Sequence, residues 1–235
     1  MKGGGGKNNK KDEKPEYRHE SNISDWTWRP GDIIWSDGAA GVGHMGIVTH
    51  FNNTGGEIAS GVLPSSWSRP SGAVLSIVDA NTGGVNLHQG ALLMDAWQKK
   101  YDTVRRYTYA FYFGWPGFMP PCDYKDCTLS GKNYYNYVTQ RMFAIVNWAM
   151  GQVNKPYNWN FFNKNADDST YCSQLVWNAY RQTARPSPRP EWRNIDLDSN
   201  GGWIVYPSDI LNHPLVVNMA ESKKKKVGAC KYYCF

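Results

Sequence analysis

The period at which apolar residues recur changes about halfway along the chain, and this change limits the fold more than any other feature. In the first half, apolar and polar residues alternate with a period of two, as they do in half-buried strands. Strands are therefore predicted at Asp32–Trp35, Gly43–His50, Val74–Asp79 and within Tyr101–Phe113. The first half is expected to be mainly antiparallel sheet.

In the second half, apolar residues recur at three- and four-residue intervals, which is typical of helices. Tyr134–Val153 is predicted to be an amphipathic helix. A second helix is expected to begin near Ser169 or Thr170, whose hydroxyls are suited to capping, and to end near Arg181. Trp203–Leu211 is expected to supply a last strand and turn. The fold class is therefore α+β, with an antiparallel sheet or small barrel packed against helices.

One folded domain is predicted at residues 25–216, with an aperiodic, cysteine-containing excursion at 114–132. Residues 1–24 are rich in Gly and Lys and poor in apolar side chains, so they are expected to form a flexible tail. A basic tail that contains Lys223–Lys226 is expected at 217–235. No signal-peptide h-region and no apolar run of roughly 18 residues occurs, so no membrane span is predicted.

The formal net charge of +6 favours contact with anionic surfaces such as wall polymers, lipid headgroups or nucleic acid. The alternative is that the basic residues only solvate the tails. The five cysteines occur as two close pairs, Cys122/Cys127 and Cys230/Cys234, and as Cys172 alone. For the paired cysteines, disulfides, a four-cysteine zinc site and plain thiols all stay open.

Cys172 is set apart by its place in the first turn of the second predicted helix. A helix N-terminus and an adjacent imidazole both stabilise a thiolate, and the free N–H groups at a helix start are suited to hold an oxyanion. These properties make Cys172 a candidate nucleophile. The alternative is a small core residue, because Cys172 shares a helix face with Leu175 and Val176.

His44 is the best candidate for the base among the five histidines. It heads an apolar strand between Gly43 and Gly46, where missing side chains let another backbone or a substrate approach. A third polar group usually holds such an imidazole in one tautomer, and Asp79 fits because it closes a neighbouring predicted strand. Asp32 is a weaker competitor. The alternatives are a structural strand histidine and an ordinary strand-end acid.

Four motifs follow one another along the chain: Gly31-Asp32-Ile33-Ile34, Gly43-His44-Met45-Gly46-Ile47-Val48, Pro156-Tyr157-Asn158 and Tyr171-Cys172-Ser173-Gln174-Leu175-Val176. This ordered set resembles the permuted branch of the NlpC/P60 superfamily, the YiiX-like papain-like cysteine peptidases and amidases. In ordinary NlpC/P60 enzymes the cysteine helix precedes the histidine strand, whereas here the histidine comes first. The resemblance implies a circularly permuted papain-like fold over residues 30–211.

The resemblance also implies roles for individual residues. Cys172 would be the nucleophile, His44 its base and Asp79 the third polar residue, with a substrate pocket lined by Tyr157, Tyr171 and Ser173. Tyr157 would line the pocket or support the oxyanion, or else be a buried core aromatic. The implied activity is hydrolysis of amide bonds through a Cys172 thioester, in peptidoglycan stem peptides or related peptides, with no cofactor and no metal.

An enzyme of this kind is expected to be secreted or to act in the periplasm or cell envelope, either as a wall hydrolase or as an antibacterial effector with a cognate immunity or inhibitor protein. Nucleic acid is not an expected partner, and contact with a membrane surface stays open. Two alternatives are a papain-like acyltransferase or thioesterase acting on lipids, and a non-catalytic binding module. A zinc enzyme built on His44 and His88 is least favoured, because no HExxH-type helix pair occurs.

Overall fold

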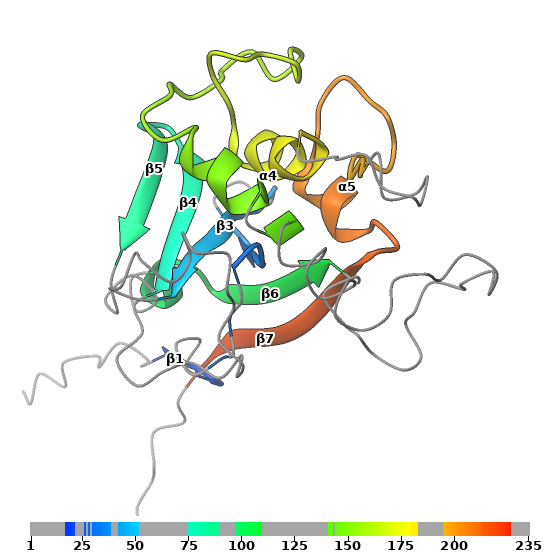
Figure 1. Ribbon diagram of the computed structural model, residues 1–235. Helices are drawn as coiled ribbons and strands as arrows, with labels where there is room; N and C mark the ends of the chain where they lie inside the picture. The colour runs from blue at the N-terminus through cyan, green and yellow to red at the C-terminus, as the bar shows by residue number, and fades with distance from the viewer. Residues whose placement is uncertain are drawn as a thin grey trace, which may run out of the picture.

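The computed structural model describes residues 17–21, 26, 28, 30–38, 42–51, 75–89, 97–109, 141–142, 144–182 and 195–226. Its named elements are β1 (Tyr17–His19), β2 (Ile33–Ser36), β3 (His44–Phe51), β4 (Leu75–Asn81), β5 (Gly84–Gln89), β6 (Thr103–Tyr109), α4 (Cys172–Arg181), α5 (Pro207–Leu211) and β7 (Val216–Lys226) (Figure 1). Residues 97–100, 141–142 and 144–150 are also helical. No helix among these residues is long and apolar enough to cross a bilayer.

The strands form one sheet in the order β1-β7-β6-β2-β3-β4-β5, and every neighbouring pair is antiparallel. This confirms the predicted α+β class with an antiparallel sheet. Within the described ranges β1 and β5 lie at opposite edges of the strand order, which is the arrangement of a sheet rather than of a closed barrel.

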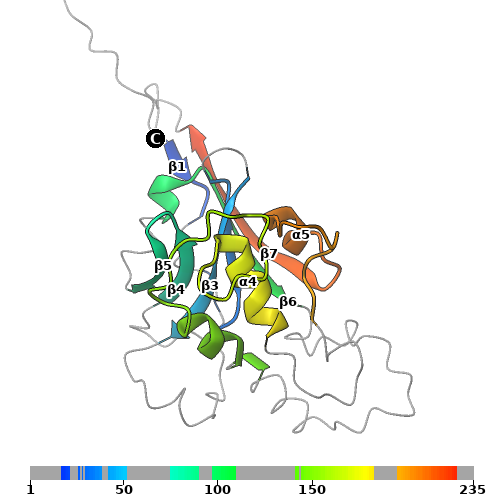
Figure 2. The same ribbon diagram turned by 90° about the horizontal axis from the view of Figure 1, so that it is seen from above.

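Helix α4 packs on one face of this sheet, against β3 and β4 (Figures 1 and 2). The fully buried residues Leu175, Val176 and Ala179 of α4 share a core cluster with Met45 and Ile47 of β3. Burial of these apolar side chains is what fixes the helix on the strand. The helix N-terminus is thereby carried to the start of β3, although the two elements lie far apart in the sequence.

A second, smaller core cluster covers the opposite face of the sheet. Its buried members are Trp28, Ile34, Val48, Ile77, Trp97, Tyr101 and Val104. Side chains on successive strand residues point to opposite faces, so His44 lies on the same face of β3 as Val48. The two core clusters therefore pack on opposite faces of the sheet near His44, the first residue of β3.

The predicted strands correspond to β2, β3, β4 and β6, and are confirmed. The predicted helix within Tyr134–Val153 is confirmed at residues 144–150, whereas residues 131–140 lie outside the described part. Helix α4 is confirmed but begins at Cys172, later than predicted. A hydroxyl does not provide its cap; instead the Gln174 side chain reaches back and Oε1 accepts the Tyr171 N–H at 3.2 Å.

The structure differs from the sequence analysis in two places, the β4–β5 hairpin and the C-terminal region. Trp203–Leu211 supplies no strand, because Pro207 begins helix α5, where its fixed φ suits a first helical position. Residues 81–84 form a tight hairpin that leads directly into β5, a strand that the sequence analysis did not predict. Strand β5 places His88 beside the pocket described below.

The predicted tails at 1–24 and 217–235 are wrong in part. Strand β1 lies within the first, all of β7 except Val216 lies within the second, and the two strands pair with each other. Strand β7 also pairs along β6. Its lysines are accommodated by acidic partners: Lys224 Nζ lies 3.0 Å from Asp102 Oδ1, and Lys225 pairs with Glu20. The basic charge of this segment is therefore partly neutralised within the fold.

Truncation of Leu175 to Ala tests whether α4 is held by its buried face. Leu175 is fully buried, so we expect the free energy of unfolding to fall by about 3 kcal/mol, the usual range for a large-to-small core substitution. Urea denaturation measures this change. The matched control is Phe162→Ala, at a side chain that is 71% exposed, where the change should stay within about 0.5 kcal/mol. Equal effects of the two variants would contradict this packing.

Candidate active site

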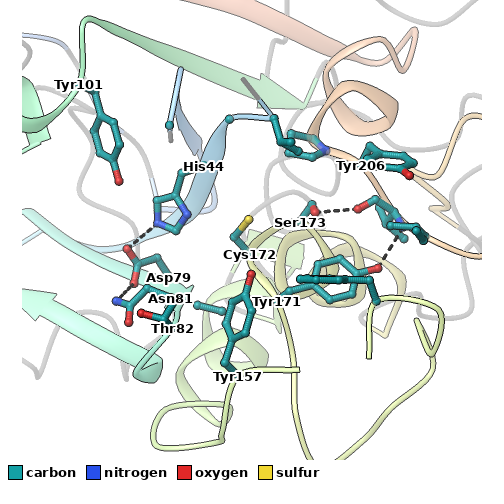
Figure 3. Close-up of a pocket in the computed structure, with 18 of the residues that line it drawn as sticks. His44, Asp79, Asn81, Thr82, Tyr101, Tyr157, Tyr171, Cys172, Ser173 and Tyr206 are labelled. Carbon is teal, nitrogen blue, oxygen red and sulfur yellow. Dashed lines mark hydrogen bonds and ion pairs between the residues drawn. The ribbon is translucent and has the colours of Figure 1, made fainter. Parts of the chain in front are cut away.

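A pocket of about 840 Å³ opens where the start of β3, the end of β4 and the N-terminus of α4 meet (Figure 3). Its potentially charged or nucleophilic groups include Cys172, His44, Asp79, His88 and Lys100. Apolar and aromatic side chains make up most of the remaining wall: Val42, Trp97, Tyr101, Tyr157, Phe161, Tyr171, Ile204, Val205, Tyr206 and Pro207. A reactive centre in a largely apolar cleft is typical of an enzyme site.

Cys172 is the first residue of α4, and its half-buried thiol points into the pocket beside His44 (Figure 3). The two side chains lie next to each other in the pocket, and Cys172 contributes to the raised pKa of His44. The first hydrogen bond of the helix runs from the Leu175 N–H to the Tyr171 carbonyl at 2.8 Å. The Cys172 N–H therefore precedes the helix's own hydrogen bonds, where helix N–H groups are open to a ligand.

The ring of His44 is held by a carboxylate and by two aromatic rings. Nε2 lies 3.0 Å from Asp79 Oδ2. Trp97 and Tyr101 stack on the imidazole with centroid distances of 5.4 Å and 6.3 Å. Because Nε2 is taken by the carboxylate, Nδ1 is the nitrogen left to interact with the thiol. The neutral ring can thus carry its proton on Nε2 and accept the Cys172 proton on Nδ1.

Asp79 reaches His44 because Gly46 lies directly opposite Asp79 in the strand register. A Cβ on Gly46 would lie 2.8 Å from Ile77 Cγ2 and 3.2 Å from Asp79 Cβ. Such contacts would force β4 away from β3. The missing side chain therefore allows the close strand approach that sets Asp79 diagonally across from His44.

His44 and Asp79 stabilise each other's charged forms. Burial is the largest influence on His44 and lowers its pKa, but hydrogen bonds to Asp79 and Cys172 and the attraction to their charges raise the pKa to about 10. Burial also acts on Asp79, raising its pKa, but hydrogen bonds from His44 and His88 bring the value down to about 2. The imidazolium form of His44 is therefore favoured next to the Asp79 carboxylate.

His88 is a second imidazole on the same carboxylate. Its Nε2 lies 2.9 Å from Asp79 Oδ1, the oxygen that His44 does not use, and Asn81 Nδ2 lies 3.4 Å from that oxygen. The sequence analysis considered His88 as one of five candidate bases and as a zinc ligand, and favoured it for neither role. Both imidazoles bond to Asp79 instead, and the described residues contain no group of three or more His, Cys, Asp or Glu side chains that could hold a metal ion.

The three predicted pocket residues all line the pocket but differ in what their polar groups do. The Tyr157 hydroxyl points toward Cys172 (Figure 3). The hydroxyl of Tyr171 accepts the Val205 N–H at 3.0 Å, and the hydroxyl of Ser173 donates to the Val205 carbonyl at 2.7 Å. Both of these side chains are buried. Their polar groups therefore fix the pocket wall at Val205 rather than face the cavity.

Two buried amides that the sequence analysis did not single out hold the Tyr157 segment in place. Asn158 Nδ2 donates to Gln174 Oε1 and to the Asn163 carbonyl, both at 3.0 Å. The Lys155 carbonyl accepts the Val85 N–H at 2.8 Å, which ties the start of the segment to β5. Asn158 and Gln174 occur inside the motifs quoted for the resemblance, which is the signal that could have found them.

Asp32, the weaker competitor of Asp79, is not part of the pocket. Its Oδ2 lies 2.7 Å from Arg106 Nε, and both side chains are buried. This ion pair joins the residue before β2 to β6. The predicted excursion at 114–132 and the paired cysteines Cys122, Cys127, Cys230 and Cys234 lie outside the described residues.

A thiol at a helix start beside a strand-borne imidazole is the arrangement of papain-like cysteine enzymes, here with the histidine first in the chain. Comparison with protein families agrees. A sequence model described as permuted papain-like amidase enzymes of the YaeF/YiiX type, the C92 family, matches residues 130–192, which include Cys172 and all of α4. This match agrees with the predicted resemblance to YiiX-like permuted papain-like enzymes over residues 130–192.

Among curated proteins, the uncharacterized protein YycO of Bacillus subtilis (strain 168) is 40% identical to this chain over 70 residues. The shared region is 28% of this chain and 25% of YycO, so the match spans about a quarter of that relative's length. No solved structure matches the chain significantly. His44 and Asp79 lie before the region that the family model covers, so their place in the site comes from the geometry.

Substitution of Gly46 by Ala is expected to separate β4 from β3. The added methyl group would collide with Ile77 and Asp79, so we expect the free energy of unfolding to fall by about 2 kcal/mol in urea denaturation. The matched control is Gly151→Ala, where the nearest atoms would lie 3.4 Å from the new Cβ and the expected change is below about 1 kcal/mol. A Gly46→Ala variant as stable as the control would contradict the register argument.

The low pKa of Asp79 predicts how the stability of the protein changes in acid. Its folded pKa of about 2 lies below the ordinary carboxyl value, so its stabilising contribution is fully present above about pH 4 and is lost as pH falls toward 2. The difference in unfolding free energy between wild type and Asp79→Asn should therefore shrink by about 2 kcal/mol over that interval. Asp102→Asn, at an 80% exposed carboxylate, is the control and should show little such trend. A constant difference for Asp79→Asn would refute the assignment.

Proposed function

We propose that this chain is a cysteine hydrolase that cleaves amide bonds, with Cys172 as nucleophile, His44 as its base and Asp79 as the group that orients His44. The observation that carries the proposal is that Cys172, His44 and Asp79 line one pocket, where the thiol lies beside His44 and His44 Nε2 lies 3.0 Å from Asp79 Oδ2. A non-catalytic role for Cys172 as a core residue is less compatible with a half-buried thiol that lines the cavity. We extend the proposal to a permuted NlpC/P60 arrangement, with the histidine strand before the cysteine helix.

In the proposed reaction His44 Nδ1 takes the thiol proton, and the Cys172 sulfur bonds to the amide carbon while the carbonyl electrons move to its oxygen. The resulting oxyanion accepts a hydrogen bond from the Cys172 N–H. Collapse of this intermediate breaks the C–N bond, and His44 returns its proton to the leaving amine. Water activated by His44 then hydrolyses the thioester and releases the carboxylic acid.

Tyr157 is the proposed second donor to the oxyanion. Its hydroxyl points toward Cys172, and burial, followed by the nearby Cys172 charge, raises its pKa to about 12. The phenol thus keeps its proton at neutral pH and can donate a hydrogen bond as negative charge develops on the carbonyl oxygen. The hydrogen bond between the side chains of Asn158 and Gln174 holds the segment that carries Tyr157 in place.

For the substrate we propose amide bonds of peptidoglycan stem peptides, which places the enzyme in the cell envelope as a secreted wall hydrolase or an antibacterial effector. An effector would be paired with an immunity or inhibitor protein. Support comes from the family's description as amidases and from a pocket large enough for several peptide residues. No step requires a metal or cofactor, since the proton transfers are all carried by His44.

A second candidate keeps the same chemistry but acts on acyl lipids, as an acyltransferase or thioesterase. The observation that favours it is the apolar mouth of the pocket, where Val42, Phe161 and Tyr206 are 54%, 38% and 44% exposed. Trp159, whose ring lies 4.8 Å from that of Tyr157, is 64% exposed. Exposed apolar groups around a mouth are suited to a lipid or acyl chain.

Hydrolysis assays on isolated peptidoglycan fragments and on acyl lipids separate the two candidates. We expect wild type to cleave the peptide amides, and Cys172→Ala and His44→Ala to lose at least about a thousandfold in kcat/KM. The matched control is His213→Ala, a half-buried histidine that stacks on Tyr109 and does not line the pocket. Cleavage of acyl lipids alone would favour the second candidate, and full activity of Cys172→Ala on either substrate would contradict the mechanism.

A further inference from the structure

The Asp79 carboxylate is shared between two histidines, and the proposed chemistry uses only one of them. Oδ2 lies 3.0 Å from His44 Nε2, and Oδ1 lies 2.9 Å from His88 Nε2. The Asp79 side chain is 5% exposed and that of His88 is 33% exposed. His88 thus connects the buried carboxylate to the pocket's solvent side.

The β4–β5 hairpin sets this contact by its register. Asp79 lies opposite Asn86 and Ile77 lies opposite His88, so these four residues share one face of the hairpin. His88 is therefore diagonal to Asp79, within reach of a long side chain. The turn is tight, because Asn81 pairs directly with Gly84. A short hairpin of fixed register leaves His88 little freedom to leave the carboxylate (Figure 1).

We propose that His88 is a positioning residue for the reaction: its bond to Oδ1 holds the Asp79 carboxylate so that Oδ2 faces His44, and its protonation weakens the Cys172–His44 pair on the acid side. The inference rests on the proposed function of Cys172 and His44. Asn81 Nδ2 also donates to Oδ1, but at 3.4 Å it is the longer and weaker of the two hydrogen bonds. Close donors on both oxygens fix the plane of a buried carboxylate, whereas a carboxylate held closely at one oxygen could rotate. His88 therefore acts on the Cys172 thiol indirectly, through Asp79 and His44.

The charges around His88 explain its expected effect on pH dependence. The groups that face it are Asp79 of β4, His44 of β3 and Lys100 of the 97–100 helical turn. The hydrogen bond to Asp79 is the largest influence and raises the pKa of His88, while desolvation and the positive charges of His44 and Lys100 lower it. Because His44 disfavours the charge on His88, a protonated His88 disfavours the imidazolium on His44 by the same amount.

The test is the rate at which iodoacetamide alkylates Cys172, followed by mass spectrometry of its peptide from about pH 5 to about pH 9, a range that spans the titration of imidazoles. His88→Ala removes the closer of the two donors to Oδ1 and should slow alkylation about tenfold at neutral pH, as loss of an orienting partner usually does. His88→Gln keeps an N–H donor without the charge. It should restore the rate to within about threefold of wild type and retain more of that rate in acid than wild type does.

His213→Gln is the matched control and should leave both the rate and the pH profile unchanged. An unchanged alkylation rate and pH profile in His88→Ala would overturn the proposal. So would a His88→Gln variant that loses as much alkylation rate as His88→Ala and also unfolds at a lower temperature, because His88 would then contribute only through packing. NMR titration of the His88 ring tests the contact without reference to the thiol: its pKa should fall in Asp79→Asn, and an unchanged value would overturn the proposal. If wild-type Cys172 reacts no faster than in the urea-unfolded chain, the proposed function fails separately.

Discussion

The packing of α4 on β3 is the contact on which the rest of the site depends. Leu175, Val176 and Ala179 bury one helix face against Met45 and Ile47, and this burial brings the helix N-terminus to the first residue of the strand. The thiol and the imidazole are not close in the sequence, so their meeting is a tertiary effect. A hydrophobic interface thus provides the geometry, and the polar groups at its edge provide the chemistry.

At that edge, the Asp79 carboxylate positions both histidines and sets their charge. It lies opposite Gly46, which lets the strands approach, and it receives His44 on one oxygen and His88 on the other. The buried carboxylate keeps its negative charge because both imidazoles donate to it, and it in turn favours a protonated His44 beside Cys172. Without Asp79, burial would favour a neutral imidazole.

The sequence predicted the parts of the site whose chemistry is tied to element ends. Cys172 was recognisable at a helix start, and His44 and Asp79 at a strand's beginning and end. The role of His88 was not recognisable, because its contact with Asp79 depends on the register between β4 and β5, and the sequence analysis did not predict β5. Strand β7 was taken for a tail because its lysines hide the strand pattern; their partners, among them Asp102 and Glu20, come from distant segments.

Alkylation of Cys172 at neutral pH in wild type and His44→Ala tests the central claim most directly, with the other four cysteines followed through their own peptides. If His44 and Cys172 form a reactive pair, wild type should react at least about tenfold faster than His44→Ala, because the imidazole stabilises the thiolate that attacks the reagent. Equal rates in the two proteins, at equal unfolding temperatures, would show a thiol indifferent to His44 and contradict the account.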